Sequence, residues 1–507
     1  MSLATIQSRA LLGVDALEVT VETHLSNGLP AFAIVGLPET AVKESKERVR
    51  SAIINSGLEF PTRRITVNLA PADLPKAGGR YDLAIALSIL IASGQLECKL
   101  LESMEVLGEL ALDGSIRAVQ GVVCAILAAK EQANKILLPA ANRQELVLVA
   151  YEHSYSASSL SELFQALTQG MPSPEFPRRA KSSSSEPHSQ DNFREIKGQA
   201  FAKRAVQIAA AGGHNLLMIG PPGSGKTLLA NLLIKVLPCL SEAEALEVAA
   251  IKSVTREQLQ QGDWSQRPIR SPHHTATSAA LVGGGHRASP GEISLAHRGV
   301  LFLDELSEFK PSVLDALREP LESGEITVSR ANYRVKFPAN FQLLAAMNPC
   351  PCGYASDPHH ECRCSEERIN RYLGKLSGPL LDRIDLVIEV PALSQVELLQ
   401  EVDDDLDWNK LRVKINLCRE NQIQRAGKLN SELHLAELKK YCNLDKEKRE
   451  GLANIMDKLS LSARATHRVI KMARTIADFD GRAAIAERDL MEAISYRRCQ
   501  ISKLLAR

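Results

Sequence analysis

One segment of the chain has the residue types and spacing of a phosphate-binding loop. It consists of Gly220, Pro221, Pro222, Gly223, Ser224, Gly225, Lys226 and Thr227. An apolar segment at 215–219 precedes it and an apolar helical segment at 228–234 follows, which is the context that such a loop requires. Glycines let backbone N–H groups curl around phosphates, and the helix N-terminus adds a favourable dipole. We expect the loop to bind ATP, with Lys226 on the outer phosphates and Thr227 on Mg²⁺; a purely structural glycine-rich turn is the alternative.

A second apolar segment, at 299–303, ends in the two acids Asp304 and Glu305. Downstream of a phosphate loop, this pattern predicts a strand that carries the carboxylates of an ATPase. Asp304 would hold the Mg²⁺ shell, and Glu305 would polarise the attacking water. The alternative is an ordinary solvated strand end.

Two more polar residues stand beside apolar segments, in positions that suit ATP hydrolysis. Asn348 follows the segment at 341–347 and can orient water against the γ-phosphate. Arg383 precedes another apolar segment. In an oligomer it can reach the γ-phosphate of a neighbouring subunit, a role worth roughly 10³–10⁵ in rate in other systems. A local salt bridge to Asp382 or Asp385 is the alternative for this arginine.

A basic helix is expected to begin near residue 461. It offers Arg464 as a further nucleotide-sensing arginine, with Arg468 as the competing choice. A solvated basic helix face is the alternative for both.

These segments belong to a chain of 507 residues, which is too long for one hydrophobic core. A segment rich in Pro, Ser and charge, at 171–192, predicts a flexible linker. It separates an N-terminal domain, 1–170, from an α/β region, 193–391, and a mostly helical region, 392–507. Within the N-terminal domain, strand-like and helix-like segments alternate at 64–69, 82–91, 122–132 and 135–138.

Composition limits the partners and the compartment. The formal net charge is +1, so any nucleic acid must be held by a local basic surface. No apolar run reaches the roughly 18 residues of a membrane helix, and the N-terminus has no signal-peptide core. We expect a cytoplasmic protein without a membrane partner.

Four of the ten cysteines crowd together as two Cys-x-Cys pairs: Cys350, Cys352, Cys362 and Cys364. In a reducing cytoplasm this crowding favours a metal site over disulfides. Gly353, Asp357 and Pro358 permit the turns that would bring four thiolates around one tetrahedral, structural Zn²⁺. His359 or His360 could replace one sulfur, and four reduced thiols on a loop are the alternative.

The central motifs resemble those of the magnesium-chelatase branch of AAA+ proteins. They are Ser271-Pro-His-His, Gly283-Gly-Gly, Pro290-Gly-Glu-Ile-Ser-Leu and Arg318-Glu-Pro-Leu-Glu-Ser-Gly. Nearly the whole chain is similar to the bacterial magnesium-chelatase-like family called YifB or ComM. The resemblance implies an α/β fold class, with a P-loop AAA+ core and a C-terminal helical lid preceded by a Lon-protease-like domain (ribosomal S5 domain 2-like). It also implies a homohexameric ring that acts on single-stranded or branched DNA as a branch-migration helicase, in natural transformation and homologous recombination.

The segment at 324–338 predicts a β-hairpin with a basic tip, because two β-branched runs flank residues 330–332. In this family the resembling hairpin precedes the Asn348 strand and points into the ring pore. The residues that would contact DNA there are Arg330, Tyr333, Arg334 and Lys336. The cations would meet phosphates, and the tyrosine would stack on a base. An ordinary basic surface hairpin is the alternative.

The N-terminal domain resembles the Lon-protease-like domain of the family in two segments, which contain Arg80 and Val123. An active protease of this kind needs a serine nucleophile at the first position and a lysine base at the second. We therefore expect a catalytically inactive domain kept for ring assembly or DNA contact. Ser88 with Lys76 is an alternative dyad, but its spacing is wrong.

Two rival functions remain open. A magnesium-chelatase subunit would use ATP to insert Mg²⁺ into a porphyrin, and a protein-remodelling AAA+ ATPase would act on other proteins. The Lon-like domain and the cysteine cluster disfavour the chelatase, whereas only family likeness disfavours the remodelling ATPase.

Overall fold

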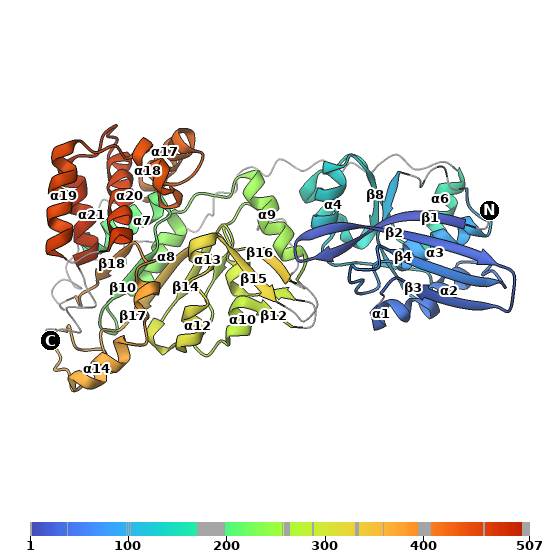
Figure 1. Cartoon of the computed structure of the whole chain (residues 1–507), viewed down its shortest axis with the longest axis horizontal. Coiled ribbons are helices and arrows are strands. Elements are labelled where there is room, and N and C mark those ends of the chain that lie inside the picture. The colour runs from blue at the N-terminus through green and yellow to red at the C-terminus, as the bar shows by residue number, and fades with distance from the viewer. Residues whose placement is uncertain are drawn as a thin grey trace. The chain divides into compact units, whose positions relative to one another are not determined.

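The chain forms two compact units, which Figure 1 shows in ribbon form. One consists of Met1–Pro187 with Ser241–Ser265, and the other of His188–Leu240 with Gln266–Arg507. The computed structural model describes residues 3–37, 39–97, 99, 101, 103–169, 198–255, 257, 264–285, 288–329, 334–357, 359–393, 407–459 and 462–498. The linker predicted at 171–192 lies outside these residues. Across the described ranges, no helix is both long enough and apolar enough to cross a membrane.

A seven-stranded sheet forms the centre of the N-terminal unit. In spatial order its strands are β3 (Ala31–Val35), β4 (Arg64–Ala70), β2 (Asp15–Ser26), β1 (Leu3–Leu12), β5 (Met104–Val106), β8 (Lys135–Pro139) and β9 (Ser154–Ala157). Buried and more exposed residues alternate along β4, as expected for a strand with one face on the core. The strands predicted at 64–69 and 135–138 are β4 and β8. A separate two-stranded ribbon pairs β6 (Glu109–Leu110) with β7 (Ile116–Arg117).

The helices of this unit are α1 (Thr40–Lys43), α2 (Ser45–Asn55), α3 (Asp82–Ala92), α4 (Val122–Glu131), α5 (Arg143–Val149), α6 (Leu160–Gln169) and α9 (Glu242–Ser253). Every residue of α3 is buried, because this helix is apolar on all sides and packs on β1 and β2. The predicted helices at 82–91 and 122–132 are α3 and α4.

α9 lies in the sequence between the phosphate loop and the two acids, yet it belongs to the N-terminal unit. Ser241 and Glu244 form a capping box that starts the helix. Ala249 and Ala250 are buried in the same apolar cluster as residues of α4. Residues 241–265, which the sequence analysis places in the α/β region, therefore pack with the N-terminal unit.

The second unit contains a five-stranded parallel sheet. Its spatial order is β11 (Ile269–Arg270), β14 (Val300–Leu303), β17 (Gln342–Met347), β10 (Leu216–Ile219) and β18 (Leu386–Glu389). β10, β14 and β17 are buried at every residue, which explains why they are continuous apolar runs in the sequence. Because the first strand, β10, lies between the last two, the strand order reverses there, and ligands of open α/β sheets bind at such points.

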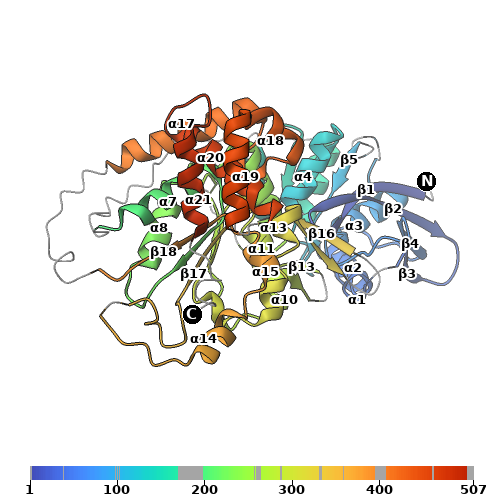
Figure 2. The same ribbon diagram turned by 60° about the vertical axis from the view of Figure 1, so that its left-hand side comes forward.

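Helices cover this sheet and continue into the C-terminal region. The longer ones are α7 (Ala200–Gly212), α8 (Lys226–Val236), α14 (Glu366–Leu373), α17 (Trp408–Ala426), α18 (Leu435–Tyr441), α19 (Lys446–Lys458), α20 (Ala463–Phe479) and α21 (Glu487–Arg498). α17 and α20 pack on α7, and α21 packs on β18 (Figure 2). One apolar cluster includes Leu216 of the sheet and Val469 of α20, so the sheet and the C-terminal helices share a core.

Short elements connect the sheet strands. They are α10 (Ser278–Val282), β12 (Gly283–Gly284), β13 (Ser289–Pro290), α11 (Glu292–Leu295), α12 (Pro311–Asp315), α13 (Pro320–Ser323), β15 (Glu325–Ser329), β16 (Arg334–Pro338) and α15 (Gly378–Leu381). β15 and β16 pair antiparallel and form the predicted hairpin. Its tip, with the predicted DNA contacts Arg330 and Tyr333, lies outside the described residues.

Candidate functional site

The predicted nucleotide residues meet at the carboxyl edge of the parallel sheet. β10 leads into the loop at 220–225, β14 is followed by Asp304, and β17 is followed by Asn348. Carboxyl ends of neighbouring parallel strands lie at the same edge, so residues far apart in sequence come together there. The sheet thus positions side chains that the sequence shows only as isolated motifs.

The loop itself has the backbone that its glycines predict. Gly223 and Gly225 have φ angles of +75° and +85°, in the left-handed region that favours glycine. Gly220 has no room for a side chain, because a Cβ there would lie 2.1 Å from the carbonyl oxygen of Val390. α8 starts directly after the loop at Lys226, so its unpaired N-terminal N–H groups face the place where phosphates would lie.

The ammonium group of Lys226 lies inside this loop. It donates to the carbonyl oxygens of Gly220 and Pro221, both at 2.8 Å, and lies 3.3 Å from Oδ1 of Asn348. Burial lowers the pKa of Lys226, and the nearby Asp304 carboxylate partly offsets that effect. The lysine expected on the outer phosphates and the amide expected beside the γ-phosphate are therefore neighbours.

The metal-binding residues also converge. The hydroxyl of Thr227 lies 3.5 Å from Oδ2 of Asp304, and the backbone N–H of Glu305 donates to Oδ1 of the same carboxylate at 2.9 Å. A hydroxyl and a carboxylate at this separation fit the oxygen ligands that Mg²⁺ prefers beside a triphosphate. Glu305 has a φ of +51°, and its Oε2 lies 3.1 Å from Nδ1 of His274. His274 therefore orients the carboxylate that would activate water.

Arg383 is held away from the two local acids that the sequence analysis names as alternatives. Its guanidinium pairs with Glu322 of α13, 61 residues away, and also donates to the carbonyl oxygen of Pro379 at 2.7 Å. The local salt-bridge alternative is wrong in its partners, because the acid that pairs with Arg383 among the described residues is Glu322, and the carboxylate of Asp385 is taken by groups from other elements.

Asp385 joins the sheet to the C-terminal helices and decides the role of Arg468. Its carboxylate is buried, accepts from the backbone N–H of Asn215 at 3.0 Å, and pairs with Arg468 and His214. Burial alone would raise the pKa of Asp385, but the charge of Arg468 and the close approach of His214 hold it far below the ordinary value. Arg464, one turn earlier on α20, is exposed and lies 3.9 Å from Glu322. Arg468 is therefore a structural anchor, and Arg464 is the arginine that remains accessible.

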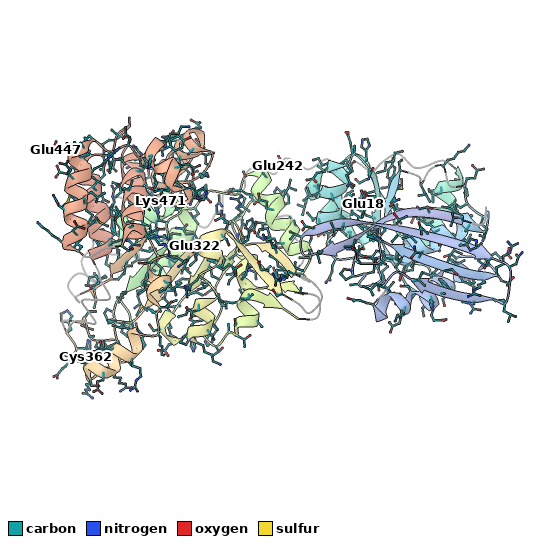
Figure 3. The ribbon with its side chains drawn as sticks, viewed as in Figure 1. Glu18, Glu242, Glu322, Cys362, Glu447 and Lys471 are labelled. Carbon is teal, nitrogen blue, oxygen red and sulfur yellow. The ribbon has the colours of Figure 1, made fainter. Side chains whose placement is uncertain are left out.

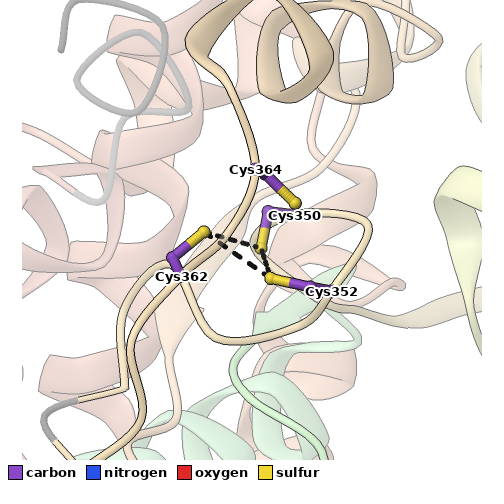
Figure 4. Close-up of side chains that lie close together, drawn as sticks. All are labelled: Cys350, Cys352, Cys362 and Cys364. Atoms are coloured by element: carbon purple, nitrogen blue, oxygen red, sulfur yellow. Dashed lines mark hydrogen bonds between the residues drawn. The ribbon is translucent and has the colours of Figure 1, made fainter.

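The four clustered cysteines lie together, as Figure 4 shows. Their sulfur atoms are within 4.8 Å of one another, with separations of 3.3, 3.7 and 3.6 Å among Cys350, Cys352 and Cys362. Four thiolates around a tetrahedral zinc, with Zn–S bonds of about 2.3 Å, would have sulfurs about 3.8 Å apart. Burial raises the pKa of Cys352, but hydrogen bonds from the Tyr354 backbone and from neighbouring thiols lower it to about 6. The donor set and its spacing therefore fit a metal ion.

Neither histidine near this cluster is part of it. The ring of His360 bonds to the Asp357 carboxylate at 3.0 Å and stacks on Tyr354, and the metal-ligand group of the described residues contains cysteines alone. The cysteine loop does contact the phosphate loop: a Cβ at Gly353 would lie 2.6 Å from Cδ of Pro222. The cluster thus belongs to a segment that lies directly against the nucleotide site.

Comparisons with known proteins identify the family of the chain. The family model described as "Magnesium chelatase, subunit ChlI" matches residues 192–398. Two others, "Subunit ChlI of Mg-chelatase" and "Magnesium chelatase, subunit ChlI C-terminal", match residues 21–142 and 407–497. Competence protein ComM of Haemophilus influenzae is 49% identical over 98% of this chain and 98% of its own length. The chain belongs to the ComM/YifB family of magnesium-chelatase-like proteins.

Other relatives define how far this likeness extends. YifB of Escherichia coli is 48% identical to this chain, over 98% of the chain and 97% of the YifB sequence. The magnesium-chelatase 38 kDa subunit of Rhodobacter capsulatus is 28% identical over only 41% of this chain and 59% of its own. The predicted fold class is confirmed: a ChlI-like AAA+ fold with an N-terminal α/β domain and a C-terminal helical region. This ComM/YifB protein is accordingly a ChlI-like AAA+ ATPase, and the family implies ATP and Mg²⁺ as cofactors.

In the N-terminal unit, the residues at the predicted protease positions are packed into the core. Arg80 is buried and donates to the carbonyl oxygen of Gln120 at 2.6 Å, and Val123 is buried in α4. The two residues of the alternative dyad bond to other groups. Ser88 bonds to Thr23 and to a backbone carbonyl, whereas Lys76 donates to a carbonyl of its own segment.

Three residues that position the site have no role assigned to them from the sequence. Gln199, with a φ of +52°, donates to the carbonyl oxygens of Ser224 at 2.8 Å and Pro391 at 3.1 Å and so braces the phosphate loop. His274 and Glu322 each hold a residue that we assign to ATP hydrolysis. His274 and Glu322 lie in the Ser271-Pro-His-His and Arg318-Glu-Pro-Leu-Glu-Ser-Gly motifs, which could have identified them. Gln199 acts through contacts between distant segments.

Proposed function

We propose that the chain is a ring-forming, ATP-driven DNA motor, a hexameric helicase that promotes branch migration during homologous recombination in natural transformation. It would act in the cytoplasm on single-stranded or branched DNA. The assignment rests on the nucleotide site and on likeness over the whole length to competence protein ComM of Haemophilus influenzae. Apart from residues 241–265, which pack with the N-terminal unit, we retain the division proposed from the sequence: an inactive Lon-like domain, a linker, the AAA+ core and a helical lid.

One observation supports the proposal of a ring. Lys226, Asn348 and Asp304 lie together at the sheet edge, whereas the contacts of Arg383 and Arg464 within the described residues join them to Glu322 and Pro379 instead. Arginines whose partners among the described residues are not those of their own nucleotide site suit contact with the phosphates of another subunit. In a ring, each subunit would supply its arginines to the nucleotide site of the next subunit, which explains why Arg383 and Arg464 pair with groups other than Lys226, Asn348 and Asp304.

The hairpin supports DNA as the substrate. Val335 and Phe337 face the core, whereas Arg334 and Lys336 are exposed on the other face of β16. Lys336 is paired with Glu325 at 3.1 Å, so one of these two cations is partly neutralised within the hairpin. A ring would bring several copies of this strand face around one pore, which concentrates a charge that the chain as a whole lacks.

We also propose that Cys350, Cys352, Cys362 and Cys364 hold one structural zinc. The sulfur separations suit a zinc ion, and four thiolates would fill its tetrahedral coordination sphere and leave no open position for catalysis. Both features favour a closed structural site. The metal would fix the loop that packs on Pro222, and so support the phosphate loop from outside.

The experiment that tests this function measures ATP hydrolysis and strand displacement by the purified protein, with and without branched DNA. We expect DNA to stimulate turnover, with an affinity that falls steeply with salt. Arg334→Glu should remove most of the stimulation and leave basal turnover intact, whereas Glu325→Gln should strengthen binding by releasing Lys336. Lys446→Glu, an exposed lysine of α19, is the matched control.

A magnesium-chelatase subunit is the second candidate, because all three matching family models carry that description. It predicts no stimulation by DNA and turnover that depends on a porphyrin and its partner subunits. A protein-remodelling ATPase predicts stimulation by unfolded protein instead. Branched DNA that neither stimulates turnover nor is unwound would contradict the DNA-motor proposal.

A further inference from the structure

Glu322, labelled in Figure 3, contacts both of the arginines that we assign to the nucleotide. Its Oε2 accepts a hydrogen bond from Nη2 of Arg383, and its Oε1 lies 3.9 Å from Nη2 of Arg464. The three residues come from different elements: α13, the turn between α15 and β18, and the first turn of α20. One carboxylate therefore joins three segments at one surface, using a different oxygen for each arginine.

Arg383 depends on this carboxylate for its orientation. Its side chain is only 10% exposed, Nη1 donates to Pro379, and Nε is buried without a hydrogen-bond partner among the described residues. A buried guanidinium needs a counter-charge close by, and Glu322 provides it. The attraction of Arg383 comes first among the effects that lower the pKa of Glu322, so the carboxylate stays charged.

Arg464 is held much more loosely. Its side chain is 66% exposed, and its separation from Glu322 is longer than a hydrogen bond. An exposed pair of this kind is readily exchanged for a stronger acceptor. Arg468, in contrast, is fixed on Asp385 and cannot take part in such an exchange without breaking the joint between sheet and helices.

We propose that Glu322 is a positioning residue that gathers Arg383 and Arg464 into a two-arginine clamp for the triphosphate of an adjacent copy of this chain. The inference rests on the ring proposed above. A guanidinium has five N–H donors, so Nη1 and Nη2 of Arg383 can keep their bonds to Pro379 and Glu322 while each still has a second N–H to offer a phosphate. Arg464 would leave its long pair with Glu322 for the more negative triphosphate.

The carboxylate thus has two effects on the clamp. It offsets the repulsion between two guanidinium groups that must lie close together, and it fixes the direction of the less mobile one before the nucleotide arrives. Orientation set in advance lowers the barrier to the chemical step without changing how the nucleotide binds its own loop.

The first test compares Glu322→Ala with Glu319→Ala. Glu319 is an exposed acid that caps the same short helix, and its side chain contacts Thr327. We expect Glu322→Ala to lower kcat by about 10- to 100-fold while KM for ATP changes by less than about twofold, because misplacement of a reacting group by an ångström costs rate and not ground-state binding. Glu319→Ala should match wild type, and Glu322→Asp should recover part of kcat.

A kcat for Glu322→Ala within about twofold of wild type would overturn the inference. So would an equal loss in Glu319→Ala. Urea unfolding measured on each variant separates misfolding from misplacement, and Glu322→Gln, which keeps the shape and removes the charge, serves if the alanine variant is unstable. A double variant, Arg383→Ala with Glu322→Ala, should be no slower than Arg383→Ala alone; additive losses would place Glu322 in another role.

Mixing experiments distinguish this inference from the ring proposal itself. Glu305→Gln has a defective site of its own but intact arginines, so mixing it with Arg383→Ala should restore turnover at mixed junctions. Glu322→Ala should behave like Arg383→Ala in the same mixture. If neither mixture recovers, the ring proposal fails; if only the Arg383→Ala mixture recovers, the role of Glu322 fails and the ring proposal stands.

Discussion

Replacing Arg464 and Arg468 separately by alanine tests the different roles that the structure gives to two arginines one helical turn apart. Both are basic residues of the same helix, and sequence reasoning leaves open which of them senses the nucleotide. In the structure Arg468 pairs with the buried Asp385, whereas Arg464 is exposed beside Glu322. The two variants should therefore fail in different ways.

The expected magnitudes follow from burial. Asp385 is 4% exposed, so Arg468→Ala leaves a buried carboxylate without its main counter-charge. Loss of one partner from a buried pair costs about 3–5 kcal/mol, and we expect about 3 kcal/mol here because Asn215 still donates to the carboxylate. The exposed pair of Arg464, at 3.9 Å, contributes less than about 1 kcal/mol. Arg464→Ala should nevertheless lower kcat for ATP by at least about tenfold, because it removes a cation that faces developing charge.

The assay can be confined to the second unit. The chain has two tryptophans, Trp264 in the N-terminal unit and Trp408 in α17, so a Trp264→Phe background reports on the second unit alone. Urea unfolding followed by Trp408 fluorescence gives the free energy of unfolding, and steady-state hydrolysis gives kcat. An Arg464→Ala protein that is destabilised as much as Arg468→Ala, or that turns over ATP normally, would refute the assignment.

Three further predictions concern the other sites. Glu305→Gln should bind ATP normally in a nucleotide titration, because Lys226 is unchanged, but its turnover measured by phosphate release should fall at least about 100-fold, because the base is lost. Wild-type turnover would exclude Glu305 as the base. Elemental analysis should find about one zinc ion per chain, lost on replacing Cys350 and Cys352 by serine but kept in a Cys239→Ser control; a stable, zinc-free wild type would exclude the site. The folded state lowers the pKa of Asp385, so the ionised carboxylate stabilises the fold above the ordinary aspartate pKa of about 3.9 and this stabilisation is lost as the pH falls below that value. The difference in free energy of unfolding between wild type and Asp385→Asn should therefore shrink by about 1.2 kcal/mol between pH 7 and pH 3. A gap that is constant with pH would show that this carboxylate is not held ionised by its partners.

Sequence predicts those parts of the site whose chemistry is local. The phosphate loop, the acids after β14 and the amide after β17 are each contained in a few consecutive residues, and the strand that positions them is an apolar run beside them. Their mutual approach follows from a general property of parallel sheets, so it too can be predicted. The cysteine cluster is similar, since two pairs separated by a short turn-forming segment need no distant partner.

The remaining contacts join segments that are far apart in the chain, and no spacing rule describes them. Arg383 pairs with Glu322 across 61 residues, although Asp382 and Asp385 are nearer in sequence. The sequence of α9 lies between the phosphate loop and the two acids, yet α9 packs in the N-terminal unit because its alanines fit against α4. Each of these outcomes depends on which surface is buried by which element, and that is a property of the assembled fold.

Three arginines of α20 show how burial divides roles that look equal in the sequence. Arg464, Arg468 and Arg474 all lie on one amphipathic helix, and each is paired with an acid. Their exposed fractions are 66%, 22% and 3%, from the first turn of the helix toward its end. The desolvation of an ion pair makes its exchange costly, so the buried Arg474 and the anchored Arg468 keep their partners, whereas Arg464 can give up Glu322 for a phosphate. The proposed two-arginine clamp needs a residue of this last kind, and its exposure leaves Arg464 available for it.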